Sequence, residues 1–160
     1  MKKHTIEINL EVYDSVSELP QEIQNLMNKA QQAREDAYAP YSRFKVGAAL
    51  ELDSGEIIIG SNQENAAFPS GLCAERVAIY QAGAAYPSGS IKTMAITARS
   101  LQHKVTNPIP PCGACRQAIA EYEIKQETPI AIYFMGETGK VAKANSIADL
   151  LPLLFDKSYL

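Results

Sequence analysis

The chain has 160 residues, of which 46% are hydrophobic and 21% charged, and this is the composition of one globular domain with a real core. Its net charge of -3 argues against nucleic acid as a partner, because neutralising a phosphate backbone needs an excess of Lys and Arg. No apolar run approaches the roughly 18 residues that span a bilayer, and the first residues lack the apolar block of a signal peptide. We therefore expect a cytoplasmic protein that acts on a small molecule, without a membrane partner.

The N-terminal part of the chain predicts a strand followed by a helix. Residues 5–13 carry an apolar side chain at every second position, which is typical of a half-buried edge strand or arm. Residues 20–38 repeat apolar side chains at helical spacing, and we expect an amphipathic helix with Ser17 as its cap and Pro40 as its stop.

The rest of the chain alternates between strand and helix patterns. The expected elements are a strand pair at 46–52 and 57–61 joined by a turn at 53–55, helix 73–84, strand 92–98, helix 114–122, strands 130–135 and 141–144, and a short helix at 146–151. Such alternation indicates an α/β fold with helices packed on a sheet. We expect an N-terminal extension over residues 1–20 and a single domain over residues 21–160.

Three cysteines carry the strongest chemical signal. Two residues separate Cys112 from Cys115, a spacing at which two thiolates can bind one metal ion, and Cys73 is the only other thiol. Each of these positions stands at the start of an expected helix, where the helix dipole favours a thiolate. Thiolates suit zinc, and three protein ligands leave the fourth tetrahedral position open, as in catalytic sites.

Glu75 is the candidate for moving protons beside this metal. It follows Cys73 by two residues in the first turn of the same expected helix, where a carboxylate can exchange protons with water and with a reacting ring. Zinc-dependent base deaminases combine such a Glu with a Pro-Cys-x-x-Cys element, which here reads Pro111-Cys112-Gly113-Ala114-Cys115. Arg76 is placed to offset the negative charge of three thiolates.

Four motifs in register resemble the homotetrameric cytidine deaminases. They are Ala39-Pro40-Tyr41-Ser42-Arg43-Phe44, Asn62-Gln63-Glu64-Asn65-Ala66, Cys73-Ala74-Glu75-Arg76 and Pro111-Cys112-Gly113-Ala114-Cys115-Arg116-Gln117. The resemblance covers roughly residues 25–155 and implies a three-layer α/β/α fold around a central mixed sheet. It also implies one zinc ion per subunit, held by Cys73, Cys112 and Cys115, and deamination of cytidine and 2'-deoxycytidine in pyrimidine salvage, with Glu75 as the proton shuttle.

The same resemblance implies a set of nucleoside contacts, namely Phe44, Asn62, Gln63, Glu64, Ala74 and Phe155. Asn62 and Glu64 would bond the ribose hydroxyl, and Ala74 would contact the base through its backbone. Phe44 would line the pocket. Phe155 would come from a neighbouring subunit, so that the homotetramer would have shared active sites.

Two segments depart from the family pattern. Residues 1–20 are lacking in the shorter members, and Phe68-Pro69-Ser70 stands where a Tyr commonly precedes the loop.

Several alternatives remain open from the residues themselves. The zinc site could be a closed structural one, completed by His103 or by another chain. The Cys112/Cys115 pair could be a redox site. The same chemistry could act on a cytosine-bearing antibiotic nucleoside or on a base within RNA. A zinc-stabilised interaction module without catalysis is the fourth alternative.

Overall fold

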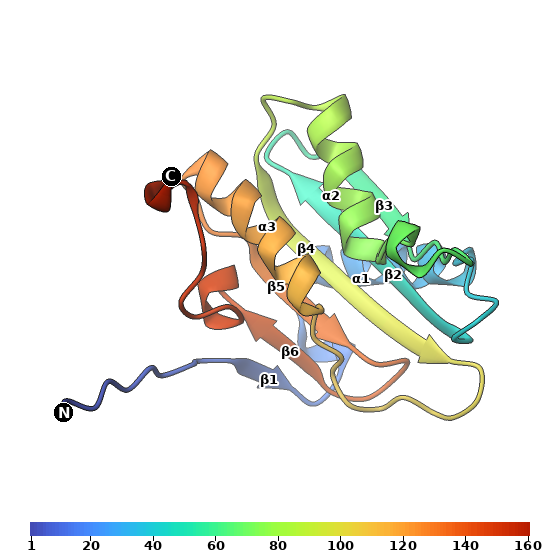
Figure 1. Ribbon diagram of the computed structural model, residues 1–160. Helices are drawn as coiled ribbons and strands as arrows, with labels where there is room; N and C mark the ends of the chain where they lie inside the picture. Colours follow the sequence, from blue (N-terminus) through green and yellow to red (C-terminus); the bar gives the residue numbers. More distant parts are fainter.

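Six strands form one mixed sheet in the order β1-β6-β5-β4-β2-β3 in the computed structural model, which describes residues 1–160 (Figure 1). The strands are β1 Glu11–Tyr13, β2 Phe44–Leu52, β3 Ile57–Ser61, β4 Ile91–Ser100, β5 Ala131–Met135 and β6 Val141–Ala144. Strands β4 and β5 run parallel, and every other neighbouring pair is antiparallel.

Helices cover both faces of this sheet. Helix α1 (Gln21–Glu35) lies on one face, and helices α2 (Ala74–Ala85) and α3 (Gly113–Gln126) lie side by side on the other (Figure 1). Each face has its own apolar core, the larger one beneath α2 and α3. The expected three-layer α/β/α architecture is confirmed. No helix is long and apolar enough to cross a membrane.

Two glycines let helices approach the sheet closely. A side-chain carbon on Gly47 of β2 would overlap the backbone of α1 at Ala30, and one on Gly60 of β3 would overlap the backbone of α2 at Ala74 and Ala78. Because the second contact lies at the first turn of α2, it fixes the start of that helix against the sheet. Cys73 is the residue that immediately precedes it.

The expected strands and helices are all present, with shifts of a few residues at most of their ends. Strands 57–61 and 141–144 have the expected bounds, and the turn at 53–55 is present with Gly55 at a φ of 92°. The last expected helix is a single 3-10 turn, Ile147–Asp149, with the Ser146 side chain accepting a bond from the Ala148 N–H.

One N-terminal prediction is confirmed only in part, and another is wrong. Only Glu11–Tyr13 of the expected strand 5–13 pairs with the sheet. The register places Leu10 opposite Ala144, the last residue of β6, so residues 5–9 have no partner strand. The cap expected at Ser17 is not used. Ser17 lies in a separate 3-10 turn, Val16–Glu18, and α1 begins after Pro20, which occupies the cap position without a side-chain bond.

Candidate active site

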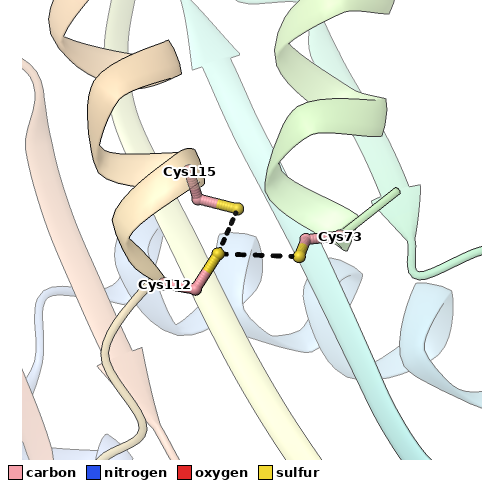
Figure 2. Close-up of side chains that lie close together, drawn as sticks. All are labelled: Cys73, Cys112 and Cys115. Carbon is pink, nitrogen blue, oxygen red and sulfur yellow. Dashed lines mark hydrogen bonds between the residues drawn. The ribbon is translucent and has the colours of Figure 1, made fainter. Parts of the chain in front are cut away.

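The three cysteine side chains meet where two helices begin. Cys73 is the N-cap of α2, Cys112 is the N-cap of α3, and Cys115 lies in the first turn of α3. The Sγ atoms of Cys73 and Cys112 are 3.8 Å apart, and those of Cys112 and Cys115 are 3.4 Å apart (Figure 2). All three Sγ atoms lie within 4.8 Å of one another.

This donor set fits a zinc ion. Four ligands placed tetrahedrally at a Zn–S distance of about 2.3 Å have sulfurs about 3.8 Å apart, close to the separations seen here. No His, Asp or Glu joins the three thiols to complete the set. His103 instead bonds the Ser100 hydroxyl at 3.2 Å, so it does not close the site. The cluster can therefore hold zinc with one position left for another ligand.

Cys73 ionises more readily than Cys115. Contact with the Cys115 thiol, supported by Arg76, lowers the pKa of Cys73 from 9.0 to about 5. The same contact and burial raise the pKa of Cys115. The metal-free chain thus carries a thiolate at Cys73 at neutral pH, which suits metal capture.

Arg76 places positive charge beside this thiolate. Its Nη2 lies 4.0 Å from the Cys73 Sγ, while its buried Nε has no hydrogen-bond partner. The guanidinium sits one helical turn from Cys73 at the positive end of α2. Arg76 therefore compensates part of the charge that three thiolates bring to a divalent metal, as expected from the sequence.

Glu75 is buried in the first turn of α2, with only 4% of its surface exposed. Burial is the main cause that raises the pKa of Glu75 above 4.5, and the nearby Cys73 charge acts in the same direction. The carboxyl group also interacts with the Cys115 thiol. A carboxyl held in this way takes up a proton more readily than an exposed one, which is the property a proton shuttle needs.

A pocket of about 570 Å³ opens beside Cys73, which is the size of a small-ligand site. Its lining residues are Tyr41, Ser42, Asn62, Gln63, Glu64, Asn65, Phe68, Gly71, Leu72, Cys73 and Arg76. The pocket therefore brings Asn62, Gln63 and Glu64 together with the first cysteine of the metal cluster.

Glu64 and Asn62 are both held by backbone groups. The Glu64 Oε2 accepts bonds from the N–H groups of Tyr41 at 2.9 Å and Ser42 at 3.2 Å. Burial alone would raise the pKa of Glu64, but bonds from Ser42 and Tyr41 bring it below 4.5, so the carboxylate is ionised at neutral pH. Asn62 is buried, and its side chain bonds the backbone of β2. Gln63 is exposed, and its side chain bonds only the Ser61 hydroxyl, at 3.1 Å.

The other three expected nucleoside contacts lie outside the pocket of their own chain. Phe44 begins β2 beside the pocket, and its carbonyl oxygen accepts a bond from Asn62. Ala74 is fully buried at the start of α2. Phe155 is 57% exposed, its ring stacks on Tyr159 at 5.7 Å, and its carbonyl oxygen accepts a bond from the Gln117 side chain.

Sequence reasoning assigned no role to several lining residues. Tyr41 and Phe68 form an edge-on aromatic pair with ring centres 6.1 Å apart at the rim. Tyr41 belongs to one of the four motifs, which was the signal available for it. Phe68 was noted only as a departure, because an exposed aromatic in a loop has no pattern that reveals what it faces.

Comparison with known proteins agrees with this geometry. The model of the cytidine and deoxycytidylate deaminase zinc-binding region matches residues 20–129. The chain is 40% identical over 132 residues to a cytidine deaminase of Halalkalibacterium halodurans, covering 82% of this chain and 92% of the relative. It is 38% identical over 136 residues to a cytidine deaminase of Sporosarcina psychrophila, covering 85% and 93%.

Solved structures show the same similarity in three dimensions. The crystal structure of cytidine deaminase from Burkholderia pseudomallei superposes with a TM-score of 0.73 at 38% identity, covering 86% of this chain and all of that one. Cytidine deaminase from Mycobacterium tuberculosis gives a TM-score of 0.65 at 28% identity, covering 86% and 99%. The family match spans both helix starts that carry the cysteines, and the chain belongs to the cytidine and deoxycytidylate deaminase family with its zinc-binding region.

Proposed function

We propose that this protein is a zinc-dependent hydrolase that converts cytidine and 2'-deoxycytidine to uridine and 2'-deoxyuridine with release of ammonia. The observation that carries the proposal is the three-thiol cluster without a fourth protein ligand. Its Cys73 lines a pocket of about 570 Å³, and its Cys115 interacts with the buried Glu75. A structural zinc site would have four protein ligands and no use for a buried acid. Membership in the family and cytidine deaminase relatives at 40% and 38% identity support the substrate.

Cys73, Cys112 and Cys115 would hold the zinc ion. Zinc supplies Lewis acidity there, which makes water a nucleophile at neutral pH. Glu75 takes a proton from the attacking water and delivers it to N3 of the cytosine ring, so that C4 becomes electrophilic. The hydroxide adds to C4, and Glu75 then carries the proton of the added hydroxyl group to the amino group. The C4–N bond breaks, ammonia leaves, and the C4 carbonyl of uridine forms. Both transfers use the same carboxyl group, so Glu75 is the residue on which the chemistry depends most.

Asn62 and Glu64 would select a nucleoside over a free base. The Glu64 carboxylate is already oriented by two backbone N–H groups in the pocket lining. An ionised carboxylate fixed in this way can accept a hydrogen bond from a sugar hydroxyl. Cytosine, which lacks the sugar, leaves these groups unmatched and should be a poor substrate.

The wider setting belongs to the same proposal. We place the reaction in pyrimidine salvage in the cytoplasm, where free nucleosides are recovered. We also propose a homotetramer in which Phe155 reaches the site of a neighbouring subunit. The support for this role is that its ring is exposed and lies outside its own chain's pocket.

Metal analysis combined with turnover tests the main proposal. Zinc per chain is measured beside ultraviolet-monitored turnover of cytidine, 2'-deoxycytidine, cytosine, adenosine and a cytidine-containing oligonucleotide. We expect one zinc per chain and turnover of the two nucleosides only. Efficient turnover of the oligonucleotide would favour a nucleic-acid substrate instead, and a loaded protein without any turnover would favour a zinc-stabilised interaction module.

Two variants separate the metal from the acid. Glu75→Gln should keep zinc and fold and lose several orders of magnitude in kcat, because it removes a general acid and base used more than once. Cys112→Ala should lose zinc and stability together, because metal binding is coupled to folding. Near-normal turnover of Glu75→Gln would contradict the assigned proton shuttle.

A further inference from the structure

The first ten residues form an exposed arm outside the body of the protein. Figure 1 shows this segment running away from β1, with the N-terminus at its far end. No hydrogen bond joins residues 1–10 to the rest of the chain. The arm nevertheless keeps a strand's alternation, with Ile6 at 43%, Ile8 at 53% and Leu10 at 42% exposure.

The arm has no strand of its own chain to pair with. In the β1–β6 register Glu11 faces Lys143 and Val12 faces Ala142, which places Leu10 opposite Ala144, the last residue of β6. Residues before Leu10 therefore run past the end of β6. A bond of 2.8 Å between the Lys143 ammonium and the Glu11 carboxylate holds this last paired position. At about 3.3 Å per residue, residues 4–10 extend the sheet edge by roughly 23 Å.

An unpaired alternating strand of this kind is a template for another strand. The outer edge of β1 is also free, since β1 is the last strand of the sheet. Exposed sheet edges are normally protected by proline or by inward-pointing charged residues. Residues 5–13 contain no proline, and no charged residue interrupts the apolar series at positions 6, 8, 10 and 12. The apolar stripe continues onto Val12, which faces Ala142 on the side of the sheet covered by α2 and α3.

We infer that the occupant of this edge is the arm of a second copy of the chain, paired antiparallel about Ile8. The two arms would join two six-stranded sheets edge to edge. In this arrangement Ile8 faces Ile8 of the other copy, and Ile6 faces Leu10. The surface is additional to the shared active sites proposed above, because it is built from the extension that shorter family members lack.

The charges of the arm select this register. Centred on Ile8, Glu7 faces Asn9 and Thr5 faces Glu11, so no like charges stand opposite each other. If the pairing were centred on Glu7, the two Glu7 side chains would stand opposite each other. If it were centred on Asn9, Glu7 would stand opposite Glu11 of the other copy. Like charges directly opposite destabilise a strand pair, whereas paired aliphatic side chains stabilise it.

Pairing of two identical edges also closes the assembly. The other free edge of the sheet is β3, where Ile57 and Ile59 are exposed. An arm that bound the β3 edge of the next copy would leave a β3 edge free at one end of the assembly and an arm free at the other. Such head-to-tail contacts propagate into a fibre unless they close into a ring. When two arms pair with each other, neither copy is left with an unpaired arm.

Engineered disulfides test the register directly. Opposite side chains in an antiparallel pair have Cβ atoms about 4.5–5.5 Å apart, near enough to be bridged, while positions displaced by four residues are about 13 Å apart. In zinc-loaded protein with oxidised glutathione as the oxidant, Ile8→Cys should give a covalent dimer on a non-reducing gel. Ile6→Cys alone and Leu10→Cys alone should not, whereas the double variant Ile6→Cys/Leu10→Cys should.

A charge placed at position 8, the centre of the proposed pairing, provides the matched control. Adding Ile8→Lys to the double-cysteine chain brings two ammonium groups together and should abolish the dimer, while adding Thr5→Lys, which faces Glu11, should leave it. Dimers from all single-cysteine variants alike would indicate chance collision of mobile arms and would overturn the inference, as would no dimer from Ile8→Cys. Because the readout is a covalent bond and not turnover, the outcome is independent of the proposed deaminase activity.

Discussion

The side-chain amide of Asn62 donates a hydrogen bond of 3.0 Å to the backbone carbonyl of Phe44. Its oxygen accepts a second bond, of 2.8 Å, from the N–H of Val46. These two bonds tie the end of β3 to the beginning of β2 at the edge of the pocket. Asn62 therefore holds the pocket wall in place whether or not a ligand is bound, and one of its two N–H groups remains available for a ligand.

Asn62→Ala should lower both stability and affinity. The change leaves the backbone groups of Phe44 and Val46 without partners in a partly buried position, which costs about 2 kcal/mol in the free energy of unfolding. Urea unfolding of the zinc-loaded protein measures this cost, and the KM for cytidine measures the affinity. Gln63→Ala, which removes an exposed side chain bonded only to Ser61, is the control and should stay within about 0.5 kcal/mol. Equal stabilities for the two variants would contradict the structural role of Asn62.

Glu64→Gln should weaken nucleoside binding without disturbing the metal. The variant keeps an oxygen for the N–H groups of Tyr41 and Ser42 but loses the charge that strengthens a bond to a sugar hydroxyl. A hydrogen bond to a charged group is worth about 1.5–3 kcal/mol, so the KM for cytidine should rise about 10- to 100-fold with zinc content unchanged. Free cytosine, which has no sugar, should be converted equally poorly by both proteins. An unchanged KM would remove Glu64 from the binding site.

The metal site could be predicted because its signals are local. Cys73 and Cys112 each stand where an apolar helical pattern begins, and the structure places both at helix N-caps. The bonds of Asn62 to β2 could not be predicted in the same way, because they join residues 16 and 18 positions apart in the chain. Only the pairing of β2 with β3 brings these groups together.

The arm shows where pattern reasoning about strands fails. The alternation of apolar and polar residues shows which side chains would share a face if the segment formed a strand. A strand forms, however, only where a neighbouring strand supplies hydrogen bonds. Residues 5–9 have the pattern without an intrachain neighbour, whereas Glu11–Tyr13 have both. The C-terminal leucines show a related limit. Leu150 is buried, and Leu151 and Leu154 pack on the core, so an apolar C-terminal run does not by itself indicate a partner chain.

The negative charge of Glu11 should stabilise the fold at neutral pH, and this contribution should be lost in strongly acidic solution. The Lys143 ammonium, together with Tyr13 and Asn145, lowers the pKa of Glu11 from 4.5 to about 2. A carboxyl group whose pKa is lower in the folded state stabilises the fold fully above pH 4.5, and this stabilisation is lost as the pH falls toward 2. The unaltered protein should therefore exceed Glu11→Gln in urea midpoint at pH 7, and the difference should narrow between pH 4.5 and 2. A difference that stayed constant down to pH 2 would show that Glu11 does not act through its charge.

Phe155→Ala should weaken cytidine binding if the ring covers the base in a neighbouring subunit. Phe155 is exposed on its own chain, so its removal should cost little stability in a single subunit. Burial of an aromatic side chain against a ligand is worth on the order of 2 kcal/mol, which corresponds to an increase in KM of tens of fold. Leu153→Ala is the matched control, because Leu153 is 87% exposed on the same tail and has no assigned contact with the nucleoside.

Mixed assemblies test whether Phe155 acts between subunits. Glu75→Gln subunits are expected to be inactive but still carry Phe155, whereas Phe155→Ala subunits keep Glu75 and the metal ligands. When the two are reassembled together, Phe155 of an inactive subunit can cover the site of an active neighbour, and the KM for cytidine should return part of the way to that of the unaltered protein. Phe155→Ala subunits mixed with Glu75→Gln assemblies that have been cross-linked, so that they cannot exchange subunits, should show no such recovery. A Phe155→Ala protein whose KM equals that of the unaltered chain would leave the aromatic pair with Tyr159 as the only role of this ring.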